Sequence, residues 1–340
     1  MESPRVIAVT GAAQFWGGWL SRRLSSAGHH VLAIDIRRPD ALPDGVEPIE
    51  VDLSNPLLTE VFQAHGVQQV LHTDFRWERR PTEAGFEHNV VGATRLLTAA
   101  TNAGVRQVVL MSHTLAYGAR PDHPAFISEN TRPRATDTGY ARHLTEIEDV
   151  VYRLRGQPDA PALTVLRFAH IVGPQSPSLM NELLKLWATP TLLGFDPLIQ
   201  LVHEEDVAAA MEHALLGWAD EPYNGAVNIG AHPPITLAKL LRAGGVQPIP
   251  VLHPLAYLSG RVSGVGPLEQ AQPLGWDTLR YPVVGDLRRM TTEFGFTPTY
   301  DTDAILTPLM ERARLRGLSI GLQRGPGQGD SRASEETPNG

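Results

Sequence analysis

The hydrophobic and polar positions near the start of the chain change between two patterns. Residues 6–9 form an unbroken apolar run, which is typical of a parallel strand buried on both faces. Over residues 17–28 the apolar side chains recur at helical spacing, and residues 30–34 form a second, largely apolar run. The sequence therefore predicts a strand, a turn at Gly11, a helix, and a second strand that is followed by Asp35.

The same alternation continues as far as Phe168. The further predicted strands cover residues 47–51, 69–72, 105–111 and 163–168. The further predicted helices cover residues 57–64, 83–103 and 139–154. Strands that alternate with helices in this way predict an α/β fold built on a parallel, doubly wound sheet.

The first strand, turn and helix carry the residues expected of a dinucleotide site. Gln14 stands between Gly11 and Gly17, where the usual pattern has a middle glycine that lets the backbone approach a pyrophosphate at the helix N-terminus. The glutamine either crowds the phosphates out, or it turns aside and donates a hydrogen bond. Asp35 suits the hydroxyl pair of a ribose and disfavours a 2′-phosphate. This pattern predicts NAD rather than NADP.

From Gly173 onward, proline and glycine become more frequent and the alternation becomes irregular. Helices are still predicted over residues 203–217, 236–243 and 303–316, and a short strand over residues 226–229. We predict a dinucleotide-binding domain of residues 1–172, to which residues 200–230 and 286–320 return, and a smaller substrate-binding lobe of residues 173–199 and 231–285. Residues 324–340 have almost no apolar side chains, which predicts a disordered tail.

Composition excludes several classes of function. The net charge of −8 argues against a broad basic face for nucleic acid. The chain has no cysteine, which excludes disulfides and thiolate metal sites, and His29 and His30 lie at a helix–strand turn where no metal site is expected. No run of 18 apolar residues occurs, and the N-terminus leads directly into the first strand. We therefore expect a cytoplasmic protein without a metal or a membrane span.

A series of short motifs follows a fixed order along the chain. The motifs are Val9-Thr10-Gly11, Gly17-Gly18, Asp52-Leu53, residues 89–94, residues 112–118, Tyr140, Arg167, residues 172–174, residues 202–207 and residues 228–230. In this order the chain resembles the extended short-chain dehydrogenase/reductases, a family of NAD-dependent sugar-nucleotide epimerases and dehydratases, over about residues 5–320. It is similar within that family to a divergent bacterial subgroup labelled UDP-glucose 4-epimerase-like.

The resemblance implies a Rossmann-type fold, bound NAD and a nucleotide-sugar substrate. It also implies a homodimer through residues 83–103 and 139–154, as in many relatives. The family's cofactor contacts fall on the first turn for the pyrophosphate, on the end of the second strand for the ribose, and after the third strand for the adenine. In that order they are Gly11, Gln14, Phe15, Trp16 and Gly17, then Asp35, then Asp52 and Leu53.

The catalytic positions match the family less well. The family uses a tyrosine as acid/base, a lysine four residues later that lowers the pKa of the tyrosine, and a serine or threonine that orients the reacting oxygen. Tyr140 is present here, but Leu144 replaces the lysine, and His113, followed by Thr114, takes the hydroxyl position. An unperturbed tyrosine has a pKa near 10, so about one in a thousand is ionised at pH 7. His143, three residues after Tyr140 on a helix, and His113 are the candidate partners.

Two functions follow from these residues, and the sequence leaves both open. One is an NAD-dependent epimerase/dehydratase-like oxidoreductase on a nucleotide-sugar-type substrate, in which Tyr140 moves the proton. The other is a catalytically degenerate protein of the same fold that senses a nucleotide or scaffolds a partner. The fold alone does not choose between them.

Overall fold

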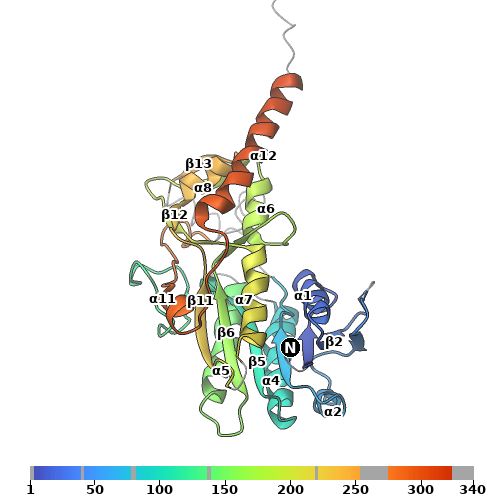
Figure 1. Cartoon of the computed structure of the whole chain (residues 1–340). Coiled ribbons are helices and arrows are strands. Elements are labelled where there is room, and N and C mark those ends of the chain that lie inside the picture. Colours follow the sequence, from blue (N-terminus) through green and yellow to red (C-terminus); the bar gives the residue numbers. More distant parts are fainter. Residues whose placement is uncertain are drawn as a thin grey trace, which may run out of the picture.

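The centre of the molecule is a seven-stranded parallel sheet (Figure 1). The computed structural model describes residues 4–39, 42–77, 82–135, 139–218, 221–252 and 275–323, without the side chains of residues 316–323. From edge to edge the strands are β11 (Gly225–Ile229), β6 (Ala162–Phe168), β5 (Gln107–His113), β4 (Gln69–His72), β1 (Val6–Thr10), β2 (His30–Asp35) and β3 (Val46–Glu50). The predicted α/β fold with a doubly wound parallel sheet is confirmed.

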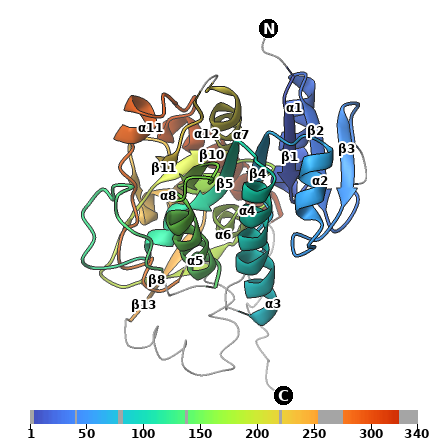
Figure 2. The same ribbon diagram turned by 90° about the horizontal axis from the view of Figure 1, so that it is seen from below.

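The chain winds outward from the middle of this sheet in both directions. Figure 2 shows β11 and β3 at opposite edges, with β4 and β1 between them. The strand order therefore reverses between β4 and β1, and in such sheets ligands bind beyond the carboxyl ends of the strands at that point. Of the predicted strands of this sheet, each begins and ends within two residues of an observed one.

Two hydrophobic clusters hold helices against the sheet. The first packs α1 (Phe15–Ser26) and α7 (Glu204–Leu216) together through side chains such as Leu24 and Met211. The second packs α2 (Leu58–Ala64), α4 (Gly92–Asn102) and α5 (Gly139–Leu154) through Phe62, Leu96 and Ile147. All seven residues of β5 are buried. Burial from both clusters explains why the sequence of this strand has no polar face.

The helix predicted over residues 83–103 is divided into three helical segments. α3 (Glu83–Phe86) leads into a π-helical turn, η1 (Glu87–Val91), which α4 continues. The turn contains Asn89, whose amide accepts a bond from the backbone nitrogen of Arg76 and donates one to its carbonyl oxygen, both at 2.8 Å. Asn89 is fully buried, so it fixes the segment after β4 against the helix.

Smaller elements gather at one end of the sheet (Figure 1). Three helices, α6 (Leu179–Lys185), α8 (Leu237–Gly244) and α12 (Thr302–Gln323), share a third hydrophobic cluster that includes Leu183, Leu241 and Ile305. Three two-stranded sheets accompany them: β10 (Leu201–His203) with β7 (His170–Val172), β12 (Ile235–Thr236) with β9 (Leu198–Ile199), and β13 (Gln247–Val251) with β8 (Ala188–Leu192). Among the described residues, the remaining elements are η2 (Thr114–Tyr117) and α11 (Arg288–Thr292).

The exact division into two domains stays a prediction. Residues 253–274 of the predicted lobe and the predicted tail, residues 324–340, lie outside the described residues. Within the described part of the chain, no helix combines the length and apolar character needed to cross a membrane. The same residues contain no group of three or more histidine, aspartate and glutamate side chains placed to hold a metal ion.

Candidate active site

A cavity of about 580 Å³ lies where the strand order reverses. Its walls come from the turn after β1, the segment after β4, the end of β5, the start of α5, β7 and α6. The predicted site residues among its lining are Gln14, Phe15, Trp16, His113 and Tyr140. The sheet therefore brings predicted cofactor and catalytic residues to one cavity, although Gln14 and Tyr140, for example, lie 126 positions apart in the sequence.

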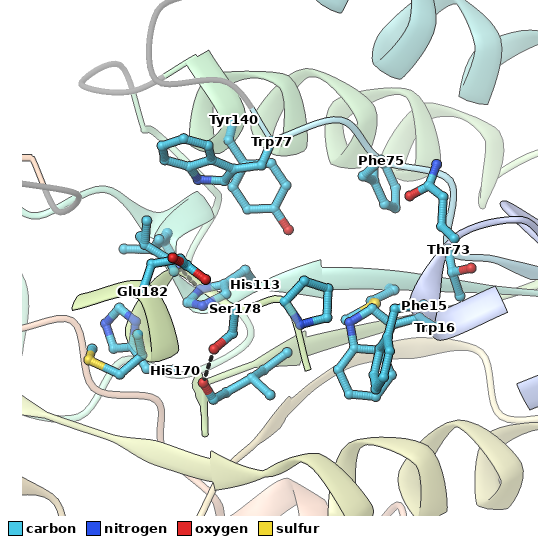
Figure 3. A pocket seen from close by; sticks show the side chains of 17 residues that line it. Phe15, Trp16, Thr73, Phe75, Trp77, His113, Tyr140, His170, Ser178 and Glu182 are labelled. Carbon is cyan, nitrogen blue, oxygen red and sulfur yellow. Dashed lines mark hydrogen bonds between the residues drawn. The ribbon is translucent and has the colours of Figure 1, made fainter. Parts of the chain in front are cut away.

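The cavity has two ends of different character (Figure 3). Phe15, Trp16 and Phe75 gather at the end formed by the β1–α1 turn and the segment after β4. His113 and His170 lie at the other end, near α6. We call these the turn end and the histidine end. The hydroxyl of Tyr140 points into the open centre between them.

The β1–α1 turn requires both of its glycines. Gly11 has a φ of +72°, and a Cβ there would lie 3.0 Å from Cα of Asp74. A Cβ on Gly17 would lie 2.3 Å from the carbonyl oxygen of Gly11, so helix and turn pack too closely for any side chain. The Gln14 side chain makes no N-cap hydrogen bond, and the first turn of α1 contains no acid. The backbone N–H groups in the first turn of α1 therefore have no acidic side chain as a partner and suit a phosphate.

Gln14 takes the second of the two arrangements that the sequence allowed. Its side-chain amide turns aside and donates a hydrogen bond to the carboxylate of Asp74. Nε2 of His88 lies 3.0 Å from the same carboxylate oxygen. Burial raises the pKa of Asp74, but the hydrogen bond and charge of His88 outweigh it, so the pKa falls below its ordinary value. A buried carboxylate that two side chains cover thus lies beside the turn end, outside the cavity lining.

The predicted ribose and adenine residues lie at the ends of β2 and β3. Asp35 is buried, and its two carboxylate oxygens accept hydrogen bonds from the backbone nitrogens of Ala13, at 3.0 Å, and Arg37, at 3.1 Å. Asp52 is exposed, and hydrogen bonds from Ser54 lower its pKa. Each carboxylate oxygen has a second lone pair, so Asp35 fixes the turn and still offers acceptors to a ligand.

Leu53, the other predicted adenine residue, is buried and packs in the hydrophobic cluster behind α4. Of the predicted cofactor residues, it is the one whose role in the described structure is wholly that of core packing.

Tyr140 enters the cavity without a charged partner. It is the second residue of α5, and within the described part of the chain its hydroxyl makes no hydrogen bond. Burial raises its pKa well above the ordinary value. Leu144, at the position of the family's lysine, is 1% exposed and offers only apolar surface. Tyr140 is therefore a phenol, not a phenolate, at neutral pH.

His143 and Thr114 lie outside the cavity lining. Nδ1 of His143 is 3.1 Å from the Asn89 amide nitrogen, and its ring meets Phe86 edge to face. Thr114 is buried at the start of η2. The His143 ring contacts the segment around η1, and its role as a partner for Tyr140 stays a prediction.

His113 meets a second histidine that the sequence analysis did not single out. The rings of His113 and His170 lie edge to face, with centroids 5.1 Å apart. Burial lowers the pKa of both histidines, that of His170 to about 4. Repulsion from a charged His170 lowers the pKa of His113 further. Both are neutral at pH 7. His170 belongs to a three-residue strand with no periodic pattern, so no signal in the sequence marked it.

Arg167 and Asn228, which belong to two of the ordered motifs, form part of a buried network behind β5. The Arg167 guanidinium donates to the Glu148 carboxylate at 2.9 Å and to the Tyr117 hydroxyl at 2.7 Å. That hydroxyl donates to Oδ1 of Asn228 at 2.8 Å. Neither residue lines the cavity. Their role in the described structure is to join β6, β11 and α5.

A family model and several known proteins are similar to this chain in sequence. A model of the NAD dependent epimerase/dehydratase family matches residues 7–230. The uncharacterized protein Rv0501 of Mycobacterium tuberculosis is 31% identical, over 94% of this chain and 90% of that protein. Short-chain dehydrogenase/reductase family 42E member 1 of Xenopus laevis is 27% identical, over 62% of this chain and 58% of that protein.

Solved structures share the fold. MoeE5 in complex with UDP-glucuronic acid and NAD superimposes with a TM-score of 0.69 at 22% identity, over 91% of this chain and 99% of that one. The Bordetella bronchiseptica enzyme WbmG in complex with NAD gives a TM-score of 0.68 at 20% identity, over 93% and 96%. At these identities the likeness establishes the Rossmann-type architecture.

Proposed function

Because the chain belongs to the NAD-dependent epimerase/dehydratase family, we propose that it is an oxidoreductase that binds NAD at the β1–α1 turn and acts on a small molecule in the adjoining cavity. The observation that carries this proposal is the shared cavity. The Tyr140 hydroxyl opens into the same space as the N-terminus of α1, which is where the family's cofactor and acid/base residue have to meet.

The residues of the turn fit the cofactor. The first-turn amides of α1 would hold the pyrophosphate, helped by the two glycines that keep side chains away from it. Asp35 would hold the adenosine ribose. Gln14 covers the Asp74 carboxylate with its amide, which reduces the repulsion that this charge would exert on a phosphate. When bound, NAD supplies a reversible hydride acceptor.

Tyr140 moves the proton in this proposal. A tyrosine whose pKa is raised by burial and not lowered by a lysine keeps its proton at neutral pH. It is therefore ready to donate a proton to a carbonyl oxygen, whereas accepting one from an alcohol requires the scarce phenolate. With the reduced cofactor NADH supplying the hydride, the site would favour reduction of a carbonyl at neutral pH.

The substrate class is a separate question. MoeE5 is described with UDP-glucuronic acid and with UDP-glucose, which agrees with the nucleotide-sugar class that the motifs imply. That likeness shows the fold alone, so the nucleotide sugar stays a prediction. The homodimer and the cytoplasmic location also stay predictions.

A second candidate function is the degenerate relative without turnover. The loss of the lysine at Leu144 and the charge of Asp74 beside the turn favour it. The two candidates differ first in whether the cofactor binds at all, because a closed cofactor site leaves no hydride acceptor.

Calorimetric titration with NAD and NADP tests the proposed function. Nucleotide-stripped protein should bind NAD, and NADP more weakly because of Asp35. Gln14→Gly should bind NAD no more tightly than the native chain, since it uncovers Asp74. If the native chain fails to bind NAD while Gln14→Gly binds it, the substitution has closed the site and the degenerate alternative is correct.

A further inference from the structure

The histidine end of the cavity has few polar groups that are free to bind a ligand. Ser178 Oγ donates to the carbonyl oxygen of Ile171 at 2.6 Å and accepts from the backbone nitrogen of Asn181 at 3.1 Å. Glu182 pairs with Lys185 at 2.6 Å on the surface. Tyr140, His113 and His170 remain as the polar side chains of this end of the described lining that can still donate a hydrogen bond, whereas the Glu182 carboxylate can only accept one.

The hydrogen bonds of the two histidines fix their tautomers. Nδ1 of His113 accepts a bond from the backbone nitrogen of Leu115 at 3.0 Å, so its proton is on Nε2. Nδ1 of His170 is buried and has no partner within the described residues. A buried N–H without an acceptor is rarer and costlier than an unused lone pair, so this proton is also on Nε2. Each ring therefore has an Nε2–H as its remaining donor.

The charge of this end also limits its ligand. Among the described lining residues there is no lysine or arginine, both imidazoles are neutral, and the acidic side chain is Glu182. The surrounding side chains are apolar, such as Ile171, Leu179 and Met180. Moving a diphosphate into such surroundings without a cation is costly, whereas an uncharged carbonyl needs only one or two N–H donors.

We propose that His113 and His170 form a two-donor site for the oxygen of an uncharged, largely apolar ketone or secondary alcohol, next to the Tyr140 hydroxyl. The proposal rests on the proposed function for the identity of the reacting group. The binding itself requires only the histidine end of the cavity. His170 then joins His113 in the place that the family gives to a serine or threonine hydroxyl.

The test uses 1-decalone, an uncharged bicyclic ketone, with a ¹³C-labelled carbonyl. Binding to the full-length protein is followed by quenching of tryptophan fluorescence, since Trp16 and Trp77 line the cavity, and the carbonyl stretch by infrared difference spectroscopy. We expect saturable binding, and a bound carbonyl stretch at lower wavenumber than in hexane. UDP-glucose at equal concentration should not displace the ketone.

Variants assign the donors. His113→Leu and His170→Leu should each weaken binding about threefold to tenfold and remove part of the carbonyl shift, as expected for one neutral hydrogen bond. His170→Gln keeps a side-chain N–H and should retain more of the shift than His170→Leu. Thermal melts confirm that each variant is folded.

Several outcomes would overturn the proposal. They are displacement by UDP-glucose, absence of ketone binding, and a carbonyl shift that is unchanged when both histidines are leucine. If the variants do not fold, a carbonyl stretch in the native protein that is not shifted from its value in hexane would also overturn the proposal. Ketone binding without NAD binding would defeat the proposed function and leave the two-donor site standing. NAD binding without ketone binding would defeat the two-donor site and leave the proposed function standing.

Discussion

The chemistry of single residues decides the direction in which Tyr140 works best. Its pKa is raised by burial, so the phenolate fraction grows about tenfold per pH unit throughout the range below that pKa. Oxidation of an alcohol needs the phenolate, and reduction of a ketone needs the phenol. We predict that kcat/KM for oxidation rises about tenfold per pH unit from pH 7 to 9, while kcat/KM for reduction stays flat.

Two variants bracket this prediction. Tyr140→Phe removes the titrating group and should abolish the rise. Leu144→Lys restores the family's cation one helical turn away and should move the rise to lower pH, at a cost in stability because position 144 is buried. A plateau already reached near pH 7 in the native enzyme would mean that some other group lowers the pKa of Tyr140.

A buried ion pair behind the cavity joins strand β6 to helix α5. Arg167 on β6 and Glu148 on α5 are 5% and 6% exposed, and Ser112 on β5 donates to the same carboxylate at 2.6 Å. Glu148→Gln leaves the guanidinium buried without its charge partner. We predict a loss of about 3–5 kcal/mol in the free energy of unfolding, measured by urea denaturation.

The same helix supplies the control. Glu146 pairs with Arg142 at 3.0 Å, but these side chains are 31% and 55% exposed. Glu146→Gln should therefore cost less than about 1 kcal/mol. If the two variants lost the same free energy of unfolding, burial would not be what makes the Arg167–Glu148 ion pair important for stability.

Elements were easier to predict from the sequence than the contacts between them. β4 was predicted at its observed residues, and Asp35, which the sequence analysis placed just after the second strand, is the last residue of β2. The partner of Gln14 was not predictable, because Asp74 lies 60 positions away and approaches only through the pairing of β1 with β4. His170 was missed for a similar reason, since its burial comes from the lobe around it and not from its neighbours in the chain.

At the scale of the whole molecule, buried neutral histidines make stability depend on pH. The pKa of His72 and that of His170 fall to about 4 through burial, and that of His113 is also lowered. Between pH 4 and 6.5 the unfolded chain binds more protons than the folded chain, so stability rises with pH in this window and is lost as pH falls. We predict a melting temperature that falls steeply from pH 6.5 to pH 4.5.

A histidine variant checks the cause. At pH 4, His72 and His170 should each contribute a loss on the order of 3 kcal/mol relative to neutral pH. His72→Gln removes one titrating group at the end of β4, so its melting temperature should depend less steeply on pH than that of the native chain. A native melting temperature that is constant from pH 7 to pH 5 would contradict these depressed pKa values.

The parallel sheet has a consequence for how this chain changes over generations. Its strands all present their carboxyl ends to one side, so the residues that face the cavity sit in turns, in short segments and at element ends, while the folding core lies beneath them. A mutation at the rim can remove a lysine or add a histidine while the seven strands keep their register. Natural selection can therefore alter the reaction of such a protein, or its substrate, without first having to find a new fold.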